Sequence, residues 1–365
     1  MRVLMLSKAL VVASYRTKLA ELSQLGVDVI AIVPESWKEA GQLIAFEPHE
    51  HKDYKILRTS IAWNGHYHIH YYPALNRIVR DVQPDIIHID EEPYNLATYL
   101  AIRSGQSVGA RSLFFTWQNI KRRYPPPYRQ IEEYVYKHAA FGLAGSQESL
   151  EILRTKGFAG RTRIIPQFGV DTHAFSPGPE RSGPFTVGFL GRLVSEKGIA
   201  ELMSAFATIE PPARLIIAGE GPLAEYVERS GADLKQQGRL ETHPRIHSNE
   251  VPGLLHRIDV LALPSRTTPR WREQYGRILV EAMASGVVVV GSDSGEIPNV
   301  IGDAGIIVAE RDSRALGQAL QQLAESVQLR RDLRKRGRAR VEAMFSQAGV
   351  AAQTAEVYNE MMSKT

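Results

Sequence analysis

The sequence predicts an α/β protein made of two doubly wound domains, each a parallel sheet covered by helices. Short apolar runs alternate with longer helical patterns in both halves of the chain, and this spacing is typical of parallel strands joined by crossover helices. The length of 365 residues fits about two domains. A stretch rich in proline and glycine, Pro166–Pro184, is predicted to be the linker between them.

In the first half, strands are predicted where short apolar runs end in turn or polar residues. These runs are Val3–Leu6, Val27–Val33, Asp85–Ile89, Ser112–Thr116 and Arg163–Pro166. A helix is predicted over Tyr15–Leu25, because Leu19, Leu22 and Leu25 share one helical face and Gly26 follows.

The second half repeats this plan. Its predicted strands are Phe185–Leu190, Arg214–Ala218, Ile258–Leu263, Val287–Gly291 and Ile306–Val308. Its predicted helices include Ile199–Ile209, Ile278–Ser285 and Arg314–Ser326. The four consecutive valines that start at Val287 suit a strand covered on both faces.

Composition excludes several classes of protein. The chain has no cysteine, which excludes a cysteine nucleophile, cysteine-ligated zinc and disulfides. A net charge of +4 is well short of the concentrated basic face of a dedicated nucleic-acid binder. No apolar run approaches the roughly 18–20 residues of a membrane span, and Met1–Leu6 fits a buried strand better than a signal peptide. We therefore expect a cytoplasmic protein.

The segment richest in candidate functional residues contains two carboxylates eight positions apart. A helix that begins near Gly276 places Glu273 in the preceding loop and Glu281 on the second turn. The free amides of the first turn favour phosphate, and carboxylates suit the vicinal hydroxyls of a sugar or ribose. A surface helix with two solvated glutamates explains the spacing equally well.

Two further loops follow predicted strands. Arg192 and Lys197 bracket the first loop, where Arg192 can fork onto phosphate oxygens and Lys197 can act as a point charge. The order of residues is not that of a P-loop, and a solvated loop with incidental charges is the alternative. Gly219-Glu220-Gly221-Pro222 indicates a tight turn at the sheet edge.

Taken together, these motifs resemble the family 4 glycosyltransferases. Glycine-flanked Arg192 and Lys197, Gly-Glu-Gly-Pro, and Glu-x₇-Glu followed by Glu-Ala-Met-Ala-Ser-Gly all lie in the second half. Pro166 to Pro177 is similar to that family's interdomain segment, and Ser292-Asp293-Ser294-Gly295 to its late loop. The resemblance extends over most of the chain and is looser in the first domain.

The resemblance implies a GT-B fold, in which two Rossmann-like domains face a cleft. An acceptor-binding domain would span residues 1–170, joined by a C-terminal helix at 347–365 that crosses back to it. A nucleotide-sugar-binding domain would span residues 171–346. The implied reaction is transfer of a sugar, with retention at the anomeric carbon, from a nucleotide-diphosphate sugar (a UDP- or GDP-sugar) to an acceptor hydroxyl.

By the same resemblance, Arg192 and Lys197 would neutralise the departing diphosphate, Glu273 would hold the donor sugar and Glu281 the ribose. The remaining donor contacts would come from Gly191, Gly221, Gln274, Tyr275, Gly276, Arg277, Ile278 and, for the base, Ile246 within Arg245–His247. The chain contains no DxD signature, so we expect no obligate metal and no other required cofactor.

The first domain departs from the family pattern where a histidine is usual. Gln118 stands at that place and is a candidate acceptor residue. A glutamine cannot shuttle a proton, but it can form a neutral hydrogen bond to the donor sugar. His88, which precedes an acidic cluster, is either an acceptor contact or a structural histidine. Tyr15, Arg16 and Lys18 either meet an anionic acceptor or are solvated.

Three more segments have open interpretations. His66, His68 and His70 would share one face of a strand, as a metal site or as a half-exposed strand face. The basic, proline-rich segment Lys121–Arg129 suits a membrane surface, an anionic acceptor or a plain connecting loop. The arginine-rich helix at 330–340 is expected to be a solvated face.

Two other functions remain open at this point. A sugar-nucleotide 2-epimerase on the same fold would turn over donor without an acceptor. A non-catalytic sugar-nucleotide-binding subunit would bind donor without transferring it. A dinucleotide dehydrogenase is disfavoured, because no GxGxxG motif follows the first strand of either domain.

Overall fold

The computed structural model describes the chain except for residues 40, 49–51, 180, 245, 248 and 364–365. The chain forms two compact units. The first unit runs from Met1 to Gly169 and resumes at Gln347, and the second runs from Val170 to Ser346. The second unit is therefore inserted between two segments of the first.

The first unit is built on a seven-stranded parallel sheet in the order β5-β2-β1-β6-β7-β8-β9. The strands are β1 (Arg2–Leu6), β2 (Asp28–Pro34), β5 (Lys55–Thr59), β6 (Ile86–Ile89), β7 (Arg111–Thr116), β8 (Phe141–Ala144) and β9 (Arg161–Ile164). The helices are α1 (Thr17–Gln24), α2 (Leu75–Val82), α3 (Leu96–Gln106), α4 (Tyr128–His138), α5 (Gln147–Thr155) and α14 (Gln347–Met362). An antiparallel hairpin joins β3 (Ser36–Glu39) to β4 (Gln42–Ala45).

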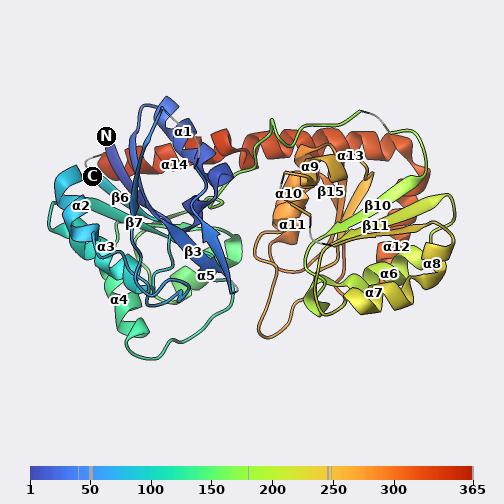
Figure 1. Cartoon of the computed structure of the whole chain (residues 1–365), viewed down its shortest axis with the longest axis horizontal. Coiled ribbons are helices and arrows are strands. Elements are labelled where there is room, and N and C mark those ends of the chain that lie inside the picture. Colours follow the sequence, from blue (N-terminus) through green and yellow to red (C-terminus); the bar gives the residue numbers. More distant parts are fainter. Residues whose placement is uncertain (40, 49–51, 180, 245, 248, 364–365) are drawn as a thin grey trace. The chain divides into compact units, whose positions relative to one another are not determined.

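Both faces of this sheet are buried. Successive residues of β1 enter different cores: Val3 and Met5 pack on one side, and Leu4 and Leu6 on the other. Helices α1 and α14 lie side by side over the first of these cores, although they come from opposite ends of the chain (Figure 1). The continuous apolar sequence of β1 is thus explained by burial on two faces.

The second unit contains a six-stranded parallel sheet in the order β12-β11-β10-β13-β14-β15. Its strands are β10 (Phe185–Leu190), β11 (Ala213–Ala218), β12 (Leu240–His243), β13 (Val260–Leu263), β14 (Val288–Ser292) and β15 (Gly305–Val308). Its helices are α6 (Ile199–Ala207), α7 (Ala224–Ser230), α8 (Ala232–Gln236), α9 (Val251–Leu255), α10 (Arg277–Ala284), α11 (Ile297–Ile301), α12 (Ser313–Glu325) and α13 (Val327–Arg340).

In each sheet the first strands to follow the starting strand are added on one side of it, and the later strands are added on its other side. This switch point lies between β1 and β6 in the first unit and between β10 and β13 in the second. In open parallel sheets, ligands bind beyond the carboxyl ends of the strands at such a switch point. We therefore expect a ligand-binding site in the loops after β1, β6, β10 and β13.

Two expectations about local structure are wrong, and several strands were not predicted. The first helix begins at Thr17 after two 3-10 turns, and Leu25 is 53% exposed outside it. The three histidines do not lie on a strand, because His66–His70 forms turns that start from Gly65 (φ +88°). Strands β3, β4, β5, β8 and β12 were not expected.

The arginine-rich helix α13 is a solvated face only in part: Arg331, Lys335 and Arg336 are exposed, whereas others are half-buried. Arg338 donates through Nη1 to the backbone oxygens of Phe175 (2.9 Å) and Ala284 (2.7 Å), and through Nη2 to that of Thr172 (3.2 Å). Arg334 pairs with Asp259 at 3.2 Å. These hydrogen bonds and this ion pair hold α13 against the rest of the second unit.

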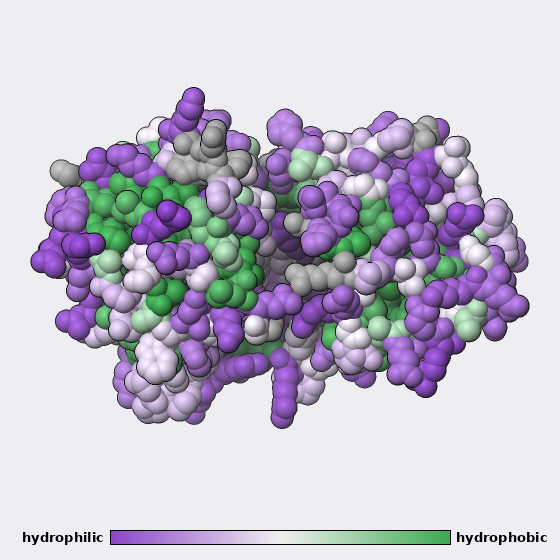
Figure 2. All heavy atoms as spheres, in the orientation of Figure 1, coloured by the Kyte–Doolittle hydropathy of each residue, from purple (hydrophilic) through white to green (hydrophobic). Residues whose placement is uncertain are grey.

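The surface is mixed in character. On the face drawn in Figure 2, hydrophilic residues predominate, and the apolar ones form separate patches among them. No helix within the described residues is long and apolar enough to cross a bilayer.

Candidate active site

Two loops of the second unit meet at its switch point. The loop after β10 contains the 3-10 turn Ser195–Lys197 and ends at Gly198, and the loop after β13 begins at Pro264. Gly198 has a φ of +68°, and a Cβ placed on it would lie 1.8 Å from the Pro264 oxygen. Only glycine permits this approach, which brings Lys197 against the second loop.

Lys197 and Glu273 form an ion pair at this junction. Lys197 Nζ lies 2.5 Å from Glu273 Oε2, and the two side chains are 15% and 9% exposed. Lys197 Nζ also lies 5.3 Å from the ring centroid of Trp271, within cation–π range. The pair satisfies both charges in a site that is largely shielded from water.

The loop after β13 holds Glu273 through its side chain and its backbone. Ser265, which is fully buried, donates from Oγ to Glu273 Oε2 at 2.9 Å. Ser292 in turn donates to the Ser265 backbone oxygen at 2.5 Å. The Glu296 amide donates to the Glu273 backbone oxygen at 3.0 Å. Gly295, at φ +54°, leaves room for that oxygen, because a Cβ there would lie 2.1 Å from it.

Helix α10 begins where the sequence predicted. Gly276 is its N-terminal cap in the left-handed conformation (φ +68°), with no side-chain cap, and Glu281 lies on the second turn. Glu281 Oε1 accepts a hydrogen bond of 2.7 Å from Arg277 Nε. Burial raises the pKa of Glu281, and the charge of Arg277 partly offsets that rise.

The other predicted donor residues lie in these two loops, at the start of α10, or after β11 and β12. Arg192, two residues after β10, is exposed, and its side chain makes no hydrogen bond or ion pair with any other residue that the structure describes. Gln274 and Arg277 are exposed, Tyr275 and Ile278 pack partly on the core, and Gly191 and Gly221 follow β10 and β11. Ile246 also packs on the core, whereas Arg245 is outside the described residues.

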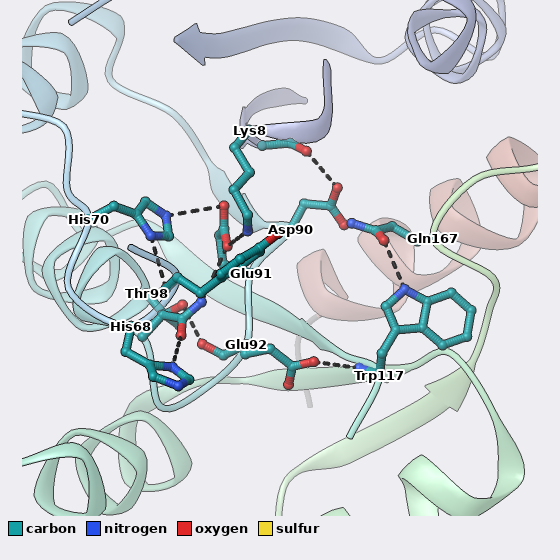
Figure 3. A network of polar contacts seen from close by, with 12 residues as sticks. Lys8, His68, His70, Asp90, Glu91, Glu92, Thr98, Trp117 and Gln167 are labelled. Atoms are coloured by element: carbon teal, nitrogen blue, oxygen red, sulfur yellow. Dashed lines mark hydrogen bonds and ion pairs between the residues drawn. The ribbon is translucent and has the colours of Figure 1, made fainter. Parts of the chain in front are cut away.

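The carboxyl edge of the first unit's sheet carries a second polar network, shown in Figure 3. Lys8, from the loop after β1, pairs with Glu91, which follows β6. Burial alone would raise the pKa of Glu91, but the Lys8 ammonium and His70 lower it to about 2. Beside them, Ser7 donates to Asp90 at 2.7 Å. This network was not predicted, because its partners are far apart in the sequence.

Glu92 links the ends of two neighbouring strands. One oxygen accepts from Thr116 Oγ1 at 2.6 Å and the other from the Trp117 amide at 2.8 Å. Burial raises the pKa of Glu92 to about 7, against the lowering effect of these two donors. Trp117 in turn donates from its indole nitrogen to Gln167 at 2.8 Å (Figure 3).

The predicted acceptor residues are mostly buried within the first unit. Arg16 packs on Phe46 and donates to the Glu47 oxygen, and Lys18 donates to the Gln167 oxygen at 3.1 Å. Both are almost inaccessible, at 0% and 2% exposure, so the alternative that they are solvated is wrong.

Three acceptor candidates remain. His88 is fully buried, with Nδ1 2.6 Å from the Tyr358 hydroxyl of α14, and this burial lowers its pKa. Tyr15 stacks on Phe168 with 4.5 Å between ring centroids. Gln118 is buried, donates to the Ile120 oxygen at 3.2 Å and accepts from Lys156 at 3.0 Å. For His88 and Gln118 the structure gives an internal hydrogen-bonding role.

The histidine segment does not form a metal site. His70 is fully buried with Nε2 3.4 Å from Glu91, and His68 lies 3.4 Å from the Asn95 side chain. Among the described residues, no three histidine or carboxylate side chains gather in a way that could hold a metal ion.

Two family models match the chain. The model of the group 1 glycosyl transferases covers residues 171–340, and that of Glycosyltransferase Family 4 covers residues 12–174. The chain belongs to glycosyltransferase family 4. The first match contains the Lys197–Glu273 pair and the second contains most of the polar network of the first unit.

Curated relatives are similar over part of their length. The alpha-maltose-1-phosphate synthase of Mycolicibacterium smegmatis is 28% identical over 238 residues, which are 58% of this chain and 60% of the relative. The glycogen synthase of Mycobacterium tuberculosis is 28% identical over 183 residues, and the match spans 43% of its length. The chain thus spans about half of these two relatives.

Solved structures show the fold. Sucrose-phosphate synthase from Thermosynechococcus elongatus superposes with a TM-score of 0.72 at 18% identity and covers 99% of each chain. HepE of Anabaena, in complex with UDP, gives a TM-score of 0.72 at 17% identity over 99% of this chain and 100% of that chain. The predicted class of two Rossmann-like parallel-sheet domains, as in GT-B glycosyltransferases, is confirmed.

Proposed function

We propose that this family member transfers a sugar from a nucleotide-diphosphate donor to an acceptor hydroxyl, with retention at the anomeric carbon. The observation that supports this most directly is the Lys197–Glu273 pair at the switch point of the second unit. A fixed cation suits the leaving diphosphate, and a fixed carboxylate suits the hydroxyls of the donor sugar.

The donor assignment draws on three groups in the second unit. Lys197 and the exposed Arg192 would bind the diphosphate, together with the N-terminal end of α10, which has no side-chain cap. Glu281 would accept hydrogen bonds from the ribose, in exchange for its present partner Arg277. HepE, which shares the fold, was solved with UDP and with UDP-glucose, so a UDP-sugar is our first choice of donor.

In the proposed reaction, the bond between the anomeric carbon and the phosphate oxygen breaks as the acceptor oxygen bonds to that carbon. The acceptor proton passes to the departing phosphate oxygen, so no side-chain nucleophile is required. Negative charge develops on the diphosphate, and Lys197 and Arg192 lower the barrier by stabilising it. In this scheme the two cations supply the charge stabilisation that a metal ion supplies elsewhere.

A donor screen tests the proposal. Thermal unfolding is measured with UDP-, GDP-, TDP- and ADP-sugars, because a ligand that binds the native state raises the melting temperature with its concentration. We expect stabilisation by one nucleotide class, and release of that nucleotide only when an acceptor is added. Absence of binding to every class would overturn the proposal, and turnover of donor without acceptor would favour an epimerase.

A further inference from the structure

The loop between β7 and α4 concentrates positive charge on the first unit. Lys121, Arg122 and Arg123 follow one another in this loop and are exposed, and Arg129 lies on the first turn of α4. Lys121 and Arg123 make no hydrogen bond or ion pair with another residue in the described part of the chain. Neither the fold nor the proposed donor site gives these two cations a role.

These side chains line a cavity of about 290 Å³. Five of its lining residues are cationic and two are acidic: Lys121, Arg122, Arg123, Arg129 and Lys156 against Glu132 and Glu133. Both acids are already paired, Glu132 with Lys156 and Glu133 with Arg129. The cavity therefore keeps an excess of positive charge, which a bound anion would neutralise.

The cavity wall is held in place by aromatic packing. Tyr124 packs on Tyr94 with 4.2 Å between ring centroids, and Lys156 Nζ lies 4.9 Å from the Tyr124 centroid. Tyr128, at the start of α4, packs on His68 at 5.3 Å. The side chains of Lys156 and Glu132 are only 9% and 8% exposed. The part of the wall formed by Tyr124, Lys156 and Glu132 is therefore in place before a ligand binds, and Lys121 and Arg123 lie beside it.

We propose that this cavity binds a phosphate-type anion carried by the acceptor, either a water-soluble phosphate ester or a phospholipid headgroup. Guanidinium groups suit phosphate because their donors match its oxygens in pairs, and a lysine adds a point charge. The link between this anion and the acceptor rests on the proposed function. The anion site itself depends on the charges and the cavity of the first unit alone.

Calorimetric titration with inorganic pyrophosphate tests the site for a soluble anion. The full chain is expected to show two pyrophosphate sites, one in this cavity and one at the proposed donor site. The double variant K121Q/R123Q should weaken the first about tenfold or more and leave the second unchanged, whereas K197A should weaken only the second. The double variant K52Q/K55Q, which removes two exposed lysines elsewhere in the first unit, should weaken neither.

Vesicle co-sedimentation tests the lipid source. Binding to phosphatidylcholine vesicles that contain phosphatidylglycerol, but not to pure phosphatidylcholine, with loss in K121Q/R123Q and not in K52Q/K55Q, would assign the site to a headgroup. Loss of pyrophosphate binding alone would assign it to a soluble phosphate ester. If K121Q/R123Q keeps normal binding in both assays, the anion site is wrong. If the full chain shows no pyrophosphate site that K197A weakens, only the proposed donor site is contradicted.

Discussion

Lys197 and Glu273 are 76 positions apart in the chain, yet Lys197 Nζ lies 2.5 Å from Glu273 Oε2. Each residue comes from one side of the switch point of the second sheet, Lys197 after β10 and Glu273 after β13. The cation proposed for the diphosphate is therefore already paired with the carboxylate proposed for the sugar. In the proposed donor complex this pair would be redistributed, which would couple the two ends of the donor site.

Replacing Lys197 with alanine is expected to lower the rate of sugar transfer by about 100-fold or more, because it removes a fixed positive group from the leaving diphosphate. The variant should also lose stability, because Glu273 would keep a shielded charge without its ion-pair partner, so rates are compared well below the lower melting temperature. The measurement is kcat with the donor found in the screen. The matched control is Lys235→Ala, which removes an exposed lysine that pairs with Glu228. Equal rates in the two variants would refute the assignment of Lys197.

Ser265→Ala is expected to act on Glu273 without touching substrate. The variant removes the 2.9 Å hydrogen bond that positions the carboxylate, and we expect a fall in kcat/KM of about tenfold and a loss of stability of about 1–2 kcal/mol. Ser230→Ala, which removes an exposed hydroxyl bonded only within α7, is the control. If the Ser265 variant loses stability but keeps its kcat/KM, Ser265 is structural only.

The stability of the first unit should depend on pH through Glu91 and Glu92. The pKa of Glu91 is about 2, below its ordinary 4.5, so its stabilising contribution is present above pH 4.5 and is lost as the pH falls to 2. The pKa of Glu92 is about 7, above 4.5, so the native state holds the extra proton and stability falls as the pH rises from 4.5 to 7.

These two limbs can be separated by mutation. The free energy of unfolding is measured with urea at a series of pH values, and each range of pH in which it changes is one limb of the curve. Glu91→Gln should remove the limb below pH 4.5, and Glu92→Gln should remove the limb between pH 4.5 and 7. Each limb is expected to be on the order of 1–3 kcal/mol. A limb that persists in its own variant belongs to another group.

Arg338→Ala should destabilise the second unit by about 2–3 kcal/mol, because three backbone oxygens lose a charged donor. Arg314→Ala, at an exposed position on α12, should cost little. Chemical unfolding of the two variants measures the difference. Similar midpoints would mean that water replaces the Arg338 hydrogen bonds.

The sequence predicted the parts of the fold that depend on local apolar patterns. Strands β1, β2, β10, β11 and β14 were found within one or two residues, since each is mostly apolar and mostly buried. Strand β3 was missed because Ser36-Trp37-Lys38-Glu39 has no apolar run. The alternation of histidines resembled a strand, but Gly65 turns the chain there and His70 enters the core.

For the candidate site, the sequence predicted the loops and helix start but not the contacts between them. Glu273 and Lys197 were chosen as separate residues, and their pairing depends on β10 and β13 lying side by side in the sheet. Ser265 carried no local signal, because a serine in a loop suits many roles. The burial of Arg16, Lys18 and His88 depends on packing against distant segments, including Tyr358 of α14.

The insertion of the second unit between two segments of the first affects the order of biosynthesis. Helix α14 supplies Val350, Val357 and Tyr358 to the same core as β1, and all three are fully buried. During translation, the sheet of the first unit is made before α14, so its core is completed only at the end of synthesis. The inserted second unit has all its strands before α14 is made. Removal of α14 should thus unfold the amino-terminal half and spare the later one, the reverse of what its position in the chain suggests.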